Sequence, residues 1–381
     1  MKIVHFCLSC FYIDNFAYQE NELVAQNVAD GHDVVVIAST ETYGDDGRLH
    51  YLSPSTYIGS DGARVIRLPY RKFLPHLAMR KLRIHPYVYK LLIAEDPDTI
   101  LFHGLCGWEL ITVARYVKAH PAVKLYVDSH EDFNNSARTI ISKYFLHLCF
   151  YRWIVRRSLP SIDKILCISA DTITFVRHLY GVNSKSIEFF PLGGSILSDA
   201  EYAETRSRIR KTHGLQSDHL VFIQSGKIDY SKKLLEALGA FSSLANPNIV
   251  FLVVGYLHND IKDQVFAFMR RDSRIRFLGW KTPNKLRELL CAADIYVQPG
   301  TQSATMQMSL CCRCIAILDD VPSHKLFIND NGWLVGKKLS LNQAFRLACQ
   351  NHHRLAHMSS ESFKVATIML DYKVLASRIY V

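Results

Sequence analysis

The stretch Leu220-Val221-Phe222-Ile223-Gln224-Ser225-Gly226 is an apolar run that ends in a glycine and leads into a helix-like segment at 232–245. A continuous apolar run of this length is typical of a parallel strand that is buried on both faces. The run restarts a strand–helix alternation that pauses over residues 194–219, where the chain is polar and charged. This restart predicts a second α/β domain, since 381 residues are too many for one ordinary α/β core and enough for two.

The same alternation fills both halves of the chain. In the first half we expect strands at 3–8, 34–38, 65–68, 99–102, 124–127, 164–168 and 187–190, and helices at 18–30, 84–94, 107–119, 137–159 and 170–180. In the second half we expect strands at 220–224, 249–254, 275–278, 295–298 and 315–318, and helices at 232–245, 260–271, 285–291 and 304–312. This pattern predicts two Rossmann-like, doubly wound α/β domains that face one ligand-binding cleft. We place them at 1–193 and 194–359, and expect the helical segment 360–381 to return to the first domain.

The composition is that of an ordinary globular protein, with 49% hydrophobic and 21% charged residues. The sequence contains no window of about 18 uncharged apolar residues, so we expect no membrane span. Residues 1–8 have the pattern of a buried first strand rather than that of a signal peptide. Ten cysteines in such a chain predict free thiols in a reducing, cytoplasmic setting. The CxxC spacings Cys7–Cys10 and Cys311–Cys314 fit buried apolar positions better than a zinc or redox site, because no second ligand pair follows at finger-like spacing.

Two lysines flank the turn that follows the strand at 220–224. Gly226 lets the backbone approach a ligand closely, and Lys227 and Lys232 can converge on one diphosphate across the turn. Cations placed in this way stabilise the negative charge that develops on a departing nucleoside diphosphate. The alternative is a solvated, lysine-rich helix start, although cations at that end of a helix oppose its dipole unless an anion is bound.

A second polar loop follows the strand at 295–298 and opens a helix with Ser303, Ala304 and Thr305. The serine and threonine hydroxyl groups can cap this helix. The same helix start can bind phosphate oxygens through its backbone N–H groups, and the two interpretations are compatible. Gln307, one turn into the helix, is placed to hydrogen-bond a ribose hydroxyl.

Polar side chains also follow strands of the first domain. His103 and His130 end adjacent expected strands, so both rings are expected at the carboxyl edge of the sheet, where they can contact a sugar or an acceptor. Tyr18-Gln19-Glu20-Asn21 opens the first helix after a loop without glycine and can contact a sugar. The alternatives are a structural role for each histidine and an ordinary helix start with an acidic first turn.

Asp96-Pro97-Asp98 has the D-x-D spacing that can hold a metal against a diphosphate. This stretch precedes a strand, and it therefore lies at the amino edge of the sheet, away from the expected ligand site. We interpret it as a turn and predict no metal site.

In their order and spacing, the short motifs of this chain resemble glycosyltransferase family 4, which has the GT-B fold of two Rossmann-like domains. The resemblance covers most of the chain. Its motifs are Gly31-His32-Asp33-Val34, His130, Cys167-Ile168-Ser169, Tyr180-Gly181, Phe190-Pro191-Leu192-Gly193, Gly226-Lys227 with Lys232, Val254-Gly255, Phe277-Leu278-Gly279-Trp280, Ala293-Asp294-Ile295-Tyr296-Val297-Gln298-Pro299 and Asn331-Gly332-Trp333-Leu334-Val335.

This resemblance implies transfer of a sugar from a nucleotide sugar, UDP- or GDP-linked, with retention of anomeric configuration and with neither a metal nor another cofactor. It implies that Lys227 and Lys232 bind the diphosphate and that His130 lies near the donor sugar. Gly255 and Trp280 are expected to border the nucleotide, and a packing role is the alternative for Trp280. The acceptor would bind the first domain, and closure of the domains would exclude water.

The chain departs from the family at one motif. The usual E-x7-E pair is absent after Pro299, and Gln307 stands where the second, ribose-binding glutamate is expected. This leaves open a non-catalytic sugar-nucleotide-binding relative or partner subunit. It also leaves open a GT-B nucleotide-sugar epimerase, for which Glu131 and Asp132 are the nearest carboxylates.

The net charge is +10, and residues 71–90 and 138–157 of the first domain are basic stretches with interleaved aromatic residues. Such stretches suit an anionic membrane surface, and a solvated face above core aromatics is the alternative. Membrane docking predicts a peripheral protein on the inner face of the membrane. Its acceptor would be a glycan or a lipid-linked molecule, as in the synthesis of surface polysaccharide or lipopolysaccharide. No recognition motif accompanies the charge, which argues against nucleic acid.

Overall fold

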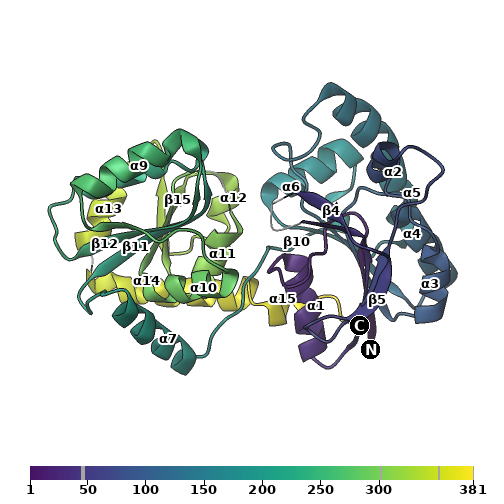
Figure 1. The fold of residues 1–381 in the computed structure, drawn as a ribbon, viewed down its shortest axis with the longest axis horizontal. Helices are drawn as coiled ribbons and strands as arrows, with labels where there is room; N and C mark the ends of the chain where they lie inside the picture. Colours follow the sequence, from purple (N-terminus) through teal and green to yellow (C-terminus); the bar gives the residue numbers. More distant parts are fainter. Residues whose placement is uncertain (44–47, 301–302, 351, 381) are drawn as a thin grey trace. The chain divides into compact units, whose positions relative to one another are not determined.

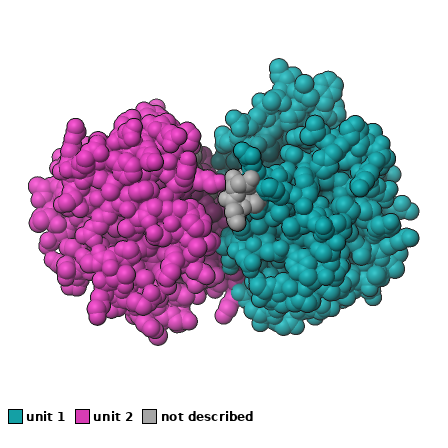
Figure 2. Space-filling model, in the orientation of Figure 1, with its two compact units in different colours: residues 1–191, 375–381 teal, residues 192–374 magenta. Residues whose placement is uncertain are grey.

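The computed structural model describes residues 1–43, 48–300, 303–350 and 352–380. The chain forms two compact units, coloured separately in Figure 2. Unit 1 consists of Met1–Pro191 together with Leu375–Val381, and unit 2 consists of Leu192–Val374. In each unit, helices pack on both faces of one main sheet (Figure 1).

The main sheet of unit 1 has the described strands in the order β10-β9-β8-β7-β1-β2-β6-β5. Neighbouring strands are parallel, apart from the antiparallel pair β5–β6 at one edge. The expected strands of this half are confirmed, while β5 and the small antiparallel pair β3–β4 are too short and exposed to show a strand pattern. The bounds are β1 Lys2–Cys7, β2 Asp33–Ser39, β3 Glu41–Tyr43, β4 Leu49–Tyr51, β5 Ser55–Ile58, β6 Arg64–Leu68, β7 Thr99–His103, β8 Lys124–Ser129, β9 Lys164–Cys167 and β10 Ile187–Phe189.

The helices of unit 1 connect these strands. Two segments expected as plain α-helix contain π-helical turns, Ser142–Tyr151 before α5 and Val176–Tyr180 after α6. Gly31 follows α1 with a φ of 85°, a left-handed conformation that favours glycine, and it turns the chain into β2. The helices are α1 Gln19–Ala29, α2 His76–Leu82, α3 Val88–Glu95, α4 Glu109–Ala119, α5 Arg152–Ser158 and α6 Ala170–Phe175, and unit 1 also includes the end of α15 Tyr372–Ser377.

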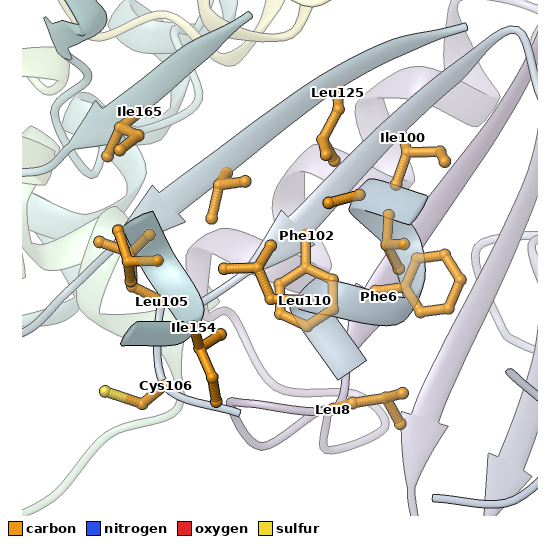
Figure 3. Close-up of a cluster of buried hydrophobic side chains, with 14 of the residues drawn as sticks. Phe6, Leu8, Ile100, Phe102, Leu105, Cys106, Leu110, Leu125, Ile154 and Ile165 are labelled. Carbon is orange, nitrogen blue, oxygen red and sulfur yellow. The ribbon is translucent and has the colours of Figure 1, made fainter. Parts of the chain in front are cut away.

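The core of unit 1 lies between its sheet and helices α4 and α5. Phe6, Phe102 and Leu125 belong to the adjacent strands β1, β7 and β8 and gather with Leu110 of α4 and Ile154 of α5 (Figure 3). All five side chains are fully buried, and each contributes about 1.5–3 kcal/mol to folding. This packing fixes the spacing of the strand ends, which carry the polar residues discussed below.

Unit 2 contains a fully parallel sheet in the order β13-β12-β11-β14-β15-β16. The expected strands are confirmed, and β16 adds an edge strand. The strand bounds are β11 Leu220–Ile228, β12 Ile249–Leu257, β13 Ile275–Phe277, β14 Ile295–Gln298, β15 Ile315–Asp319 and β16 Gly332–Val335. The helices are α7 Asp199–Thr212, α8 Leu234–Ser242, α9 Asn259–Arg271, α10 Pro283–Ala292, α11 Ala304–Cys311, α12 Pro322–Lys325, α13 Leu341–Gln350 and α14 His352–Met369.

No helix or strand was expected in residues 194–219, but most of this segment forms helix α7. Ser198 and Glu201 form a reciprocal capping box at its start. Two of its basic side chains bond to backbone: Arg206 donates to the carbonyl oxygens of Cys291 and Ala293, and Arg210 donates to that of Ala292. The arginines therefore satisfy carbonyl groups at the C-terminal end of α10.

All ten cysteines are free. Cys7, Cys311 and Cys314 are buried among apolar neighbours, whereas Cys10 is half-buried. Within the described ranges, no three or more His, Cys, Asp or Glu side chains gather as a metal-binding cluster. Among the described helices, none combines the length and the apolar composition that crossing a membrane requires.

Candidate active site

The carboxyl ends of β11 and β12 meet at a pair of glycines. β11 continues to Ile228 instead of ending at residue 224, so Gly226 and Lys227 lie on the strand. Gly226 pairs with Gly255, and both have φ near 130°, where glycine is favoured. A Cβ atom on Gly255 would lie 2.0 Å from the carbonyl oxygen of Gly226. Only glycine allows this approach, and it places the exposed Lys227 at the same edge of the sheet.

Lys232 is presented by a short 3-10 turn, Tyr230–Lys232, that leads towards α8. The side chain of Gln224 donates to the Lys232 carbonyl oxygen at 2.8 Å. Gly300 packs against the same turn, because a Cβ atom there would lie 2.2 Å from the carbonyl oxygen of Ser231. The turn is therefore held by Gln224, which lies on β11, and by Gly300, which follows β14.

Burial lowers the pKa of Lys232, and the nearby Asp229 carboxylate opposes this shift. An ammonium group that has lost part of its hydration gains more from a bound anion than an exposed one does. Lys227 is exposed. Of the two expected cations, Lys232 is therefore the one that has lost part of its hydration on folding. A bound anion would replace the interactions with water that it has lost.

Ser303 occupies the N-cap position of α11 but does not cap it. Its hydroxyl donates instead to Oε1 of Gln298 at 2.8 Å, which also accepts from the Tyr296 hydroxyl at 2.7 Å. In the part of the chain that the structure describes, no side chain therefore caps the first turn of α11, which includes the exposed Ala304 and the half-exposed Thr305. The phosphate contacts expected here stay predictions, and residues 301–302 lie outside the described residues.

Two other expected nucleotide contacts have different surroundings. Gln307 is fully buried, and its Oε1 accepts from the backbone N–H of Gly193 at 3.2 Å. Its Nε2 has no hydrogen-bond partner among the described residues. Trp280 is 67% exposed after β13. Binding of ribose by Gln307 and of a base by Trp280 both stay predictions.

In unit 1, His103 ends β7 and is completely buried. Its Nε2 lies 3.0 Å from Nδ1 of His5, and its Nδ1 contacts Oδ2 of Asp128. Both ring nitrogens are therefore engaged inside the unit, and this replaces the expected sugar contact. No local sequence pattern predicts these contacts, because His5 and Asp128 lie in other strands, far from His103 along the chain.

His130 follows β8 and keeps about a third of its side chain exposed, with Nε2 3.7 Å from Oδ2 of Asp128. Burial lowers the pKa of His130, but the Asp128 carboxylate outweighs this effect and the net shift is upward. The ring lies at the carboxyl edge of the sheet, as expected for a residue near a donor sugar. That role stays a prediction.

The start of α1 is held by its own polar side chains. Gln19 donates to the carbonyl oxygen of Pro191 at 2.7 Å, and Asn21 donates to that of Ile13 at 3.0 Å. Glu20 is buried and Tyr18 is 45% exposed. Among the described residues, no donor reaches the side-chain oxygens of Gln19 and Asn21, and sugar contacts at this helix start stay predictions.

A cavity of about 410 Å³ opens in unit 1 near the ends of β7 and β8, at a place that no sequence motif predicted. It is basic: Arg80, Lys81, Arg83 and Arg138 line it. Its other lining groups include hydroxyl, carboxyl and aromatic side chains, among them Phe11, Glu41, Glu131, Thr139, Ser142 and Tyr151. The lining residues come from distant segments, so no local motif marks this site.

Among the described residues, Glu131 is one of two carboxyl groups that line this cavity, together with Glu41. Burial raises the pKa of Glu131, against lowering contributions from Cys106 and Arg83. The Tyr180 hydroxyl donates to Oε2 of Glu131 at 3.2 Å and lies 2.9 Å from Nδ1 of His147. Such a carboxyl group can hydrogen-bond a hydroxyl of a bound molecule.

The D-x-D stretch lies in the connection between α3 and β7. Asp96 ends α3 in a left-handed conformation, and Asp98 accepts from the backbone N–H of Lys2 at 2.6 Å. Lys2 begins β1, so the stretch lies at the amino edge of the sheet, opposite the polar strand ends.

Comparisons with known proteins agree with this arrangement. The family model for Glycosyltransferase Family 4 matches residues 21–193, and the model for Glycosyl transferases group 1 matches residues 205–362. No curated protein matches the sequence.

Solved structures match over the whole length at low identity. They include HepE of Anabaena in complex with UDP, with 14% identity, 100% of this chain and 98% of that chain covered, and a TM-score of 0.63. Sucrose-phosphate synthase of Thermosynechococcus elongatus matches with 14% identity, coverage of 99% and 97%, and a TM-score of 0.67. WaaG, a glycosyltransferase involved in lipopolysaccharide biosynthesis, matches with 17% identity, coverage of 99% and 99%, and a TM-score of 0.60.

The two matched models lie in the order in which the chain forms its two Rossmann-like halves, and together they cover most of the sequence. The similar structures are glycosyltransferases and related proteins with the same fold. The chain therefore belongs to the GT-B glycosyltransferases, with a family 4 domain followed by a group 1 domain.

Proposed function

We propose that the protein transfers a hexosyl group from a nucleotide sugar, with retention of anomeric configuration, to a glycan or lipid-linked acceptor. The observation that supports the donor assignment is the half-buried side chain of Lys232, which is carried on a turn whose backbone is held by Gln224 and Gly300. The attraction of Lys232 to a diphosphate grows as the leaving group gains charge, so it stabilises the transition state more than the bound substrate.

Lys227 is the second proposed contact to the diphosphate, and the two lysines supply the positive charge without a metal or other cofactor. UDP and GDP are the nucleotides that we propose first. HepE, a similar structure, is described in complex with UDP, which supports testing UDP before the others. The start of α11 would bind phosphate oxygens through its uncapped first turn.

The acceptor would bind the basic cavity of unit 1. Tyr151 of the 138–157 stretch donates to the carbonyl oxygen of Lys81 in the 71–90 stretch at 2.5 Å. The two basic stretches therefore meet at this cavity, which both of them line. A surface of cations and aromatic residues beside an acceptor cavity suits an acceptor that carries phosphate on a lipid.

This arrangement supports a role in surface polysaccharide or lipopolysaccharide synthesis at the cytoplasmic face of a membrane. WaaG, which is described as involved in lipopolysaccharide biosynthesis, is one of the similar structures. A product analysis by NMR would report the anomeric configuration, and an assay with excess chelator would report any dependence on a divalent metal.

The donor assignment is tested by calorimetry with UDP, GDP, ADP, CMP and dTDP in the presence of chelator. We expect one nucleotide to bind, and Lys232→Ala to weaken its affinity at least about tenfold, since hydrogen bonds to charged groups are worth about 1.5–3 kcal/mol. Lys262→Ala is the matched control, because Lys262 is an exposed lysine on α9 of the same unit. Equal affinities of the two variants would overturn the role of Lys232.

A further inference from the structure

A chain of hydrogen bonds leads from the surface of unit 1 to its interior. At the outer end, the Tyr380 hydroxyl donates to the carboxylate of Asp30 and lies 3.0 Å from Nδ2 of Asn27. Oδ1 of Asn27 lies 2.8 Å from Nε2 of His5. Asn27 and His5 are completely buried, so these bonds are shielded from water.

The inner end of the chain reaches Asp128. Nδ1 of His5 lies 3.0 Å from Nε2 of His103, and the two rings stack at 5.3 Å between centroids. Nδ1 of His103 contacts Oδ2 of Asp128, whose Oδ1 accepts from the backbone N–H of Gly104 at 2.9 Å. Asp128 also faces Nε2 of His130.

The outermost hydrogen bond, between Tyr380 and Asp30, determines which group donates in each of the hydrogen bonds that follow. The hydroxyl group of Tyr380 has a single proton, and it donates this proton to Oδ2 of Asp30. The Tyr380 oxygen can then only accept from Asn27, which must turn its NH2 group outward. Oδ1 of Asn27 consequently faces His5, and Nε2 of His5 must carry a hydrogen.

Counting hydrogens then shows one additional proton. Three contacts need one hydrogen each: His5 with Asn27, His5 with His103, and His103 with Asp128. Two neutral imidazoles and one carboxylate supply only two. His5, His103 and Asp128 together therefore hold one proton more than two neutral imidazole rings and one ionised carboxylate would hold.

Electrostatics places this proton on His103. Burial lowers the pKa of His103, but Asp128 outweighs it and raises the pKa to about 10, with Cys7 and Glu20 acting in the same direction. Burial and the neighbouring His103 lower the pKa of His5 to about 3. Burial alone would raise the pKa of Asp128, but His103 and His130 hold it well below its usual range.

We propose that His103 is a positioning residue that stays an imidazolium, backed by His5, and keeps Asp128 ionised and fixed so that Asp128 orients the ring of His130. This inference rests on the proposed role of His130 beside the donor sugar. Without a cation at position 103, the buried carboxylate of Asp128 would depend on His130 as its remaining positive neighbour among the described residues. The ring of His130 would then be drawn towards Asp128 and away from the ligand.

The protonation state can be measured without any substrate. In protein with 15N-labelled histidine, long-range 1H–15N spectra distinguish an imidazolium from either neutral tautomer. We expect His103 to show two protonated nitrogens from pH 6 to pH 8.5 and His5 to stay a neutral ring with hydrogen on Nε2. A neutral His103 at pH 7 would overturn the proposal, whether or not the protein binds nucleotides.

The positioning role needs a second readout. In His103→Gln we expect the pKa of His130 to rise, because His103 is a cation that lowers it. With the nucleotide sugar whose base binds, we expect kcat for donor hydrolysis to fall about 10- to 100-fold, as for a displaced active-site group, with little change in KM.

The matched control is His120→Gln, which changes a part-buried histidine at the end of α4. We expect it to keep the wild-type kcat. If His103→Gln folds and turns over like the control, the positioning role is wrong. If no nucleotide sugar is hydrolysed by the wild type, the proposed function fails, while the spectra still decide the protonation of His103.

Discussion

The absence of a side chain at Gly300 shapes the turn that carries Lys232. A Cβ atom at residue 300 would lie 2.2 Å from the Ser231 carbonyl oxygen and 2.9 Å from Cα of Lys232. Both neighbours are backbone, so they cannot rotate away as a flexible side chain would. The position of Lys232 therefore depends on a residue that the sequence places in a different loop.

We predict that Gly300→Ala weakens nucleoside diphosphate binding about tenfold and destabilises unit 2 by about 1–3 kcal/mol, the usual range for overpacking. Gly239→Ala in α8 is the control, because a Cβ atom there meets nothing within 4 Å. That change should stabilise the fold by about 0.5–1 kcal/mol, since alanine replaces a helical glycine. Calorimetry and urea unfolding of both variants measure these effects, and indistinguishable variants would contradict the prediction.

The buried histidines also predict how stability depends on pH. The folded pKa of His103 is raised to about 10, so its contribution is full below about pH 6.5 and is lost as the pH rises towards 10. The folded pKa of His5 is lowered to about 3, so its contribution is full above about pH 6.5 and is lost as the pH falls. Together they predict a maximum near the ordinary histidine pKa of about 6.5.

The measurement is the free energy of unfolding from urea titrations between pH 5 and pH 9. The wild type should lose stability on both sides of the maximum, by up to roughly 1.4 kcal/mol per pH unit for one proton. In His103→Gln the loss on the alkaline side should largely disappear. An unchanged alkaline slope in the variant would show that His103 is not the titrating group.

For single residues, the sequence pattern predicts which polar residues lie at strand ends. It does not predict which of their side-chain atoms already have hydrogen-bond partners inside the protein. Lys232 follows a strand and a glycine, and that local pattern was sufficient to single it out. The burial of His103 was not predictable in the same way. It depends on His5 and Asp128, which reach it only because β1 and β8 flank β7 in the sheet.

At the scale of elements, the strands were predictable because continuous apolar runs are what a sheet covered on both faces requires. Helix α7 was missed for the opposite reason. It has few apolar residues, and its polar contacts with α10 include Arg206 and Arg210 on backbone carbonyl groups and an ion pair of Arg208 with Glu288. The capping box of Ser198 and Glu201 was the one local signal that could have identified it.

The basic cavity was not predictable from any one element. Arg80 belongs to α2, Glu131 to the loop after β8 and Tyr151 to a π-helical segment. Each of these elements has an ordinary pattern by itself. The cavity exists only through their packing, whereas the loops of the proposed donor site each follow a single strand and have a local sequence pattern.

The two basic stretches give a prediction about membranes. Ile141, beside a π-helical segment, is 73% exposed, and Ile368 on α14 of unit 2 is 71% exposed. We expect Ile141→Glu to reduce flotation with vesicles of phosphatidylcholine and phosphatidylglycerol, because it adds a negative charge and removes apolar surface from the proposed membrane face. Ile368→Glu, the matched control, should float like the wild type.

Flotation should also fall as salt concentration rises, because screening weakens attraction between the cations and an anionic surface. If neither the wild type nor the control binds these vesicles, the membrane part of the proposed function is wrong. If all three proteins bind equally, the bound surface lies elsewhere.

At the scale of the whole molecule, the last described residues belong to unit 1 although they follow unit 2 in the sequence. Arg378 pairs with Glu188, Ile379 is completely buried and Tyr380 bonds to Asn27. Removal of residues 378–381 should therefore loosen α1 and β10 while leaving unit 2 unchanged. Hydrogen exchange resolved by peptide measures this, and equal exchange in unit 1 with and without these residues would contradict the prediction.

This order of the chain has a consequence for biosynthesis. Unit 2 is continuous from Leu192 to Val374, whereas unit 1 is split between Met1–Pro191 and Leu375–Val381. A ribosome that adds about 5–20 residues per second needs roughly 10–40 s to translate the intervening segment. During that interval unit 1 lacks its last segment, which makes the nascent first half a natural client for a chaperone that shields the surface awaiting it.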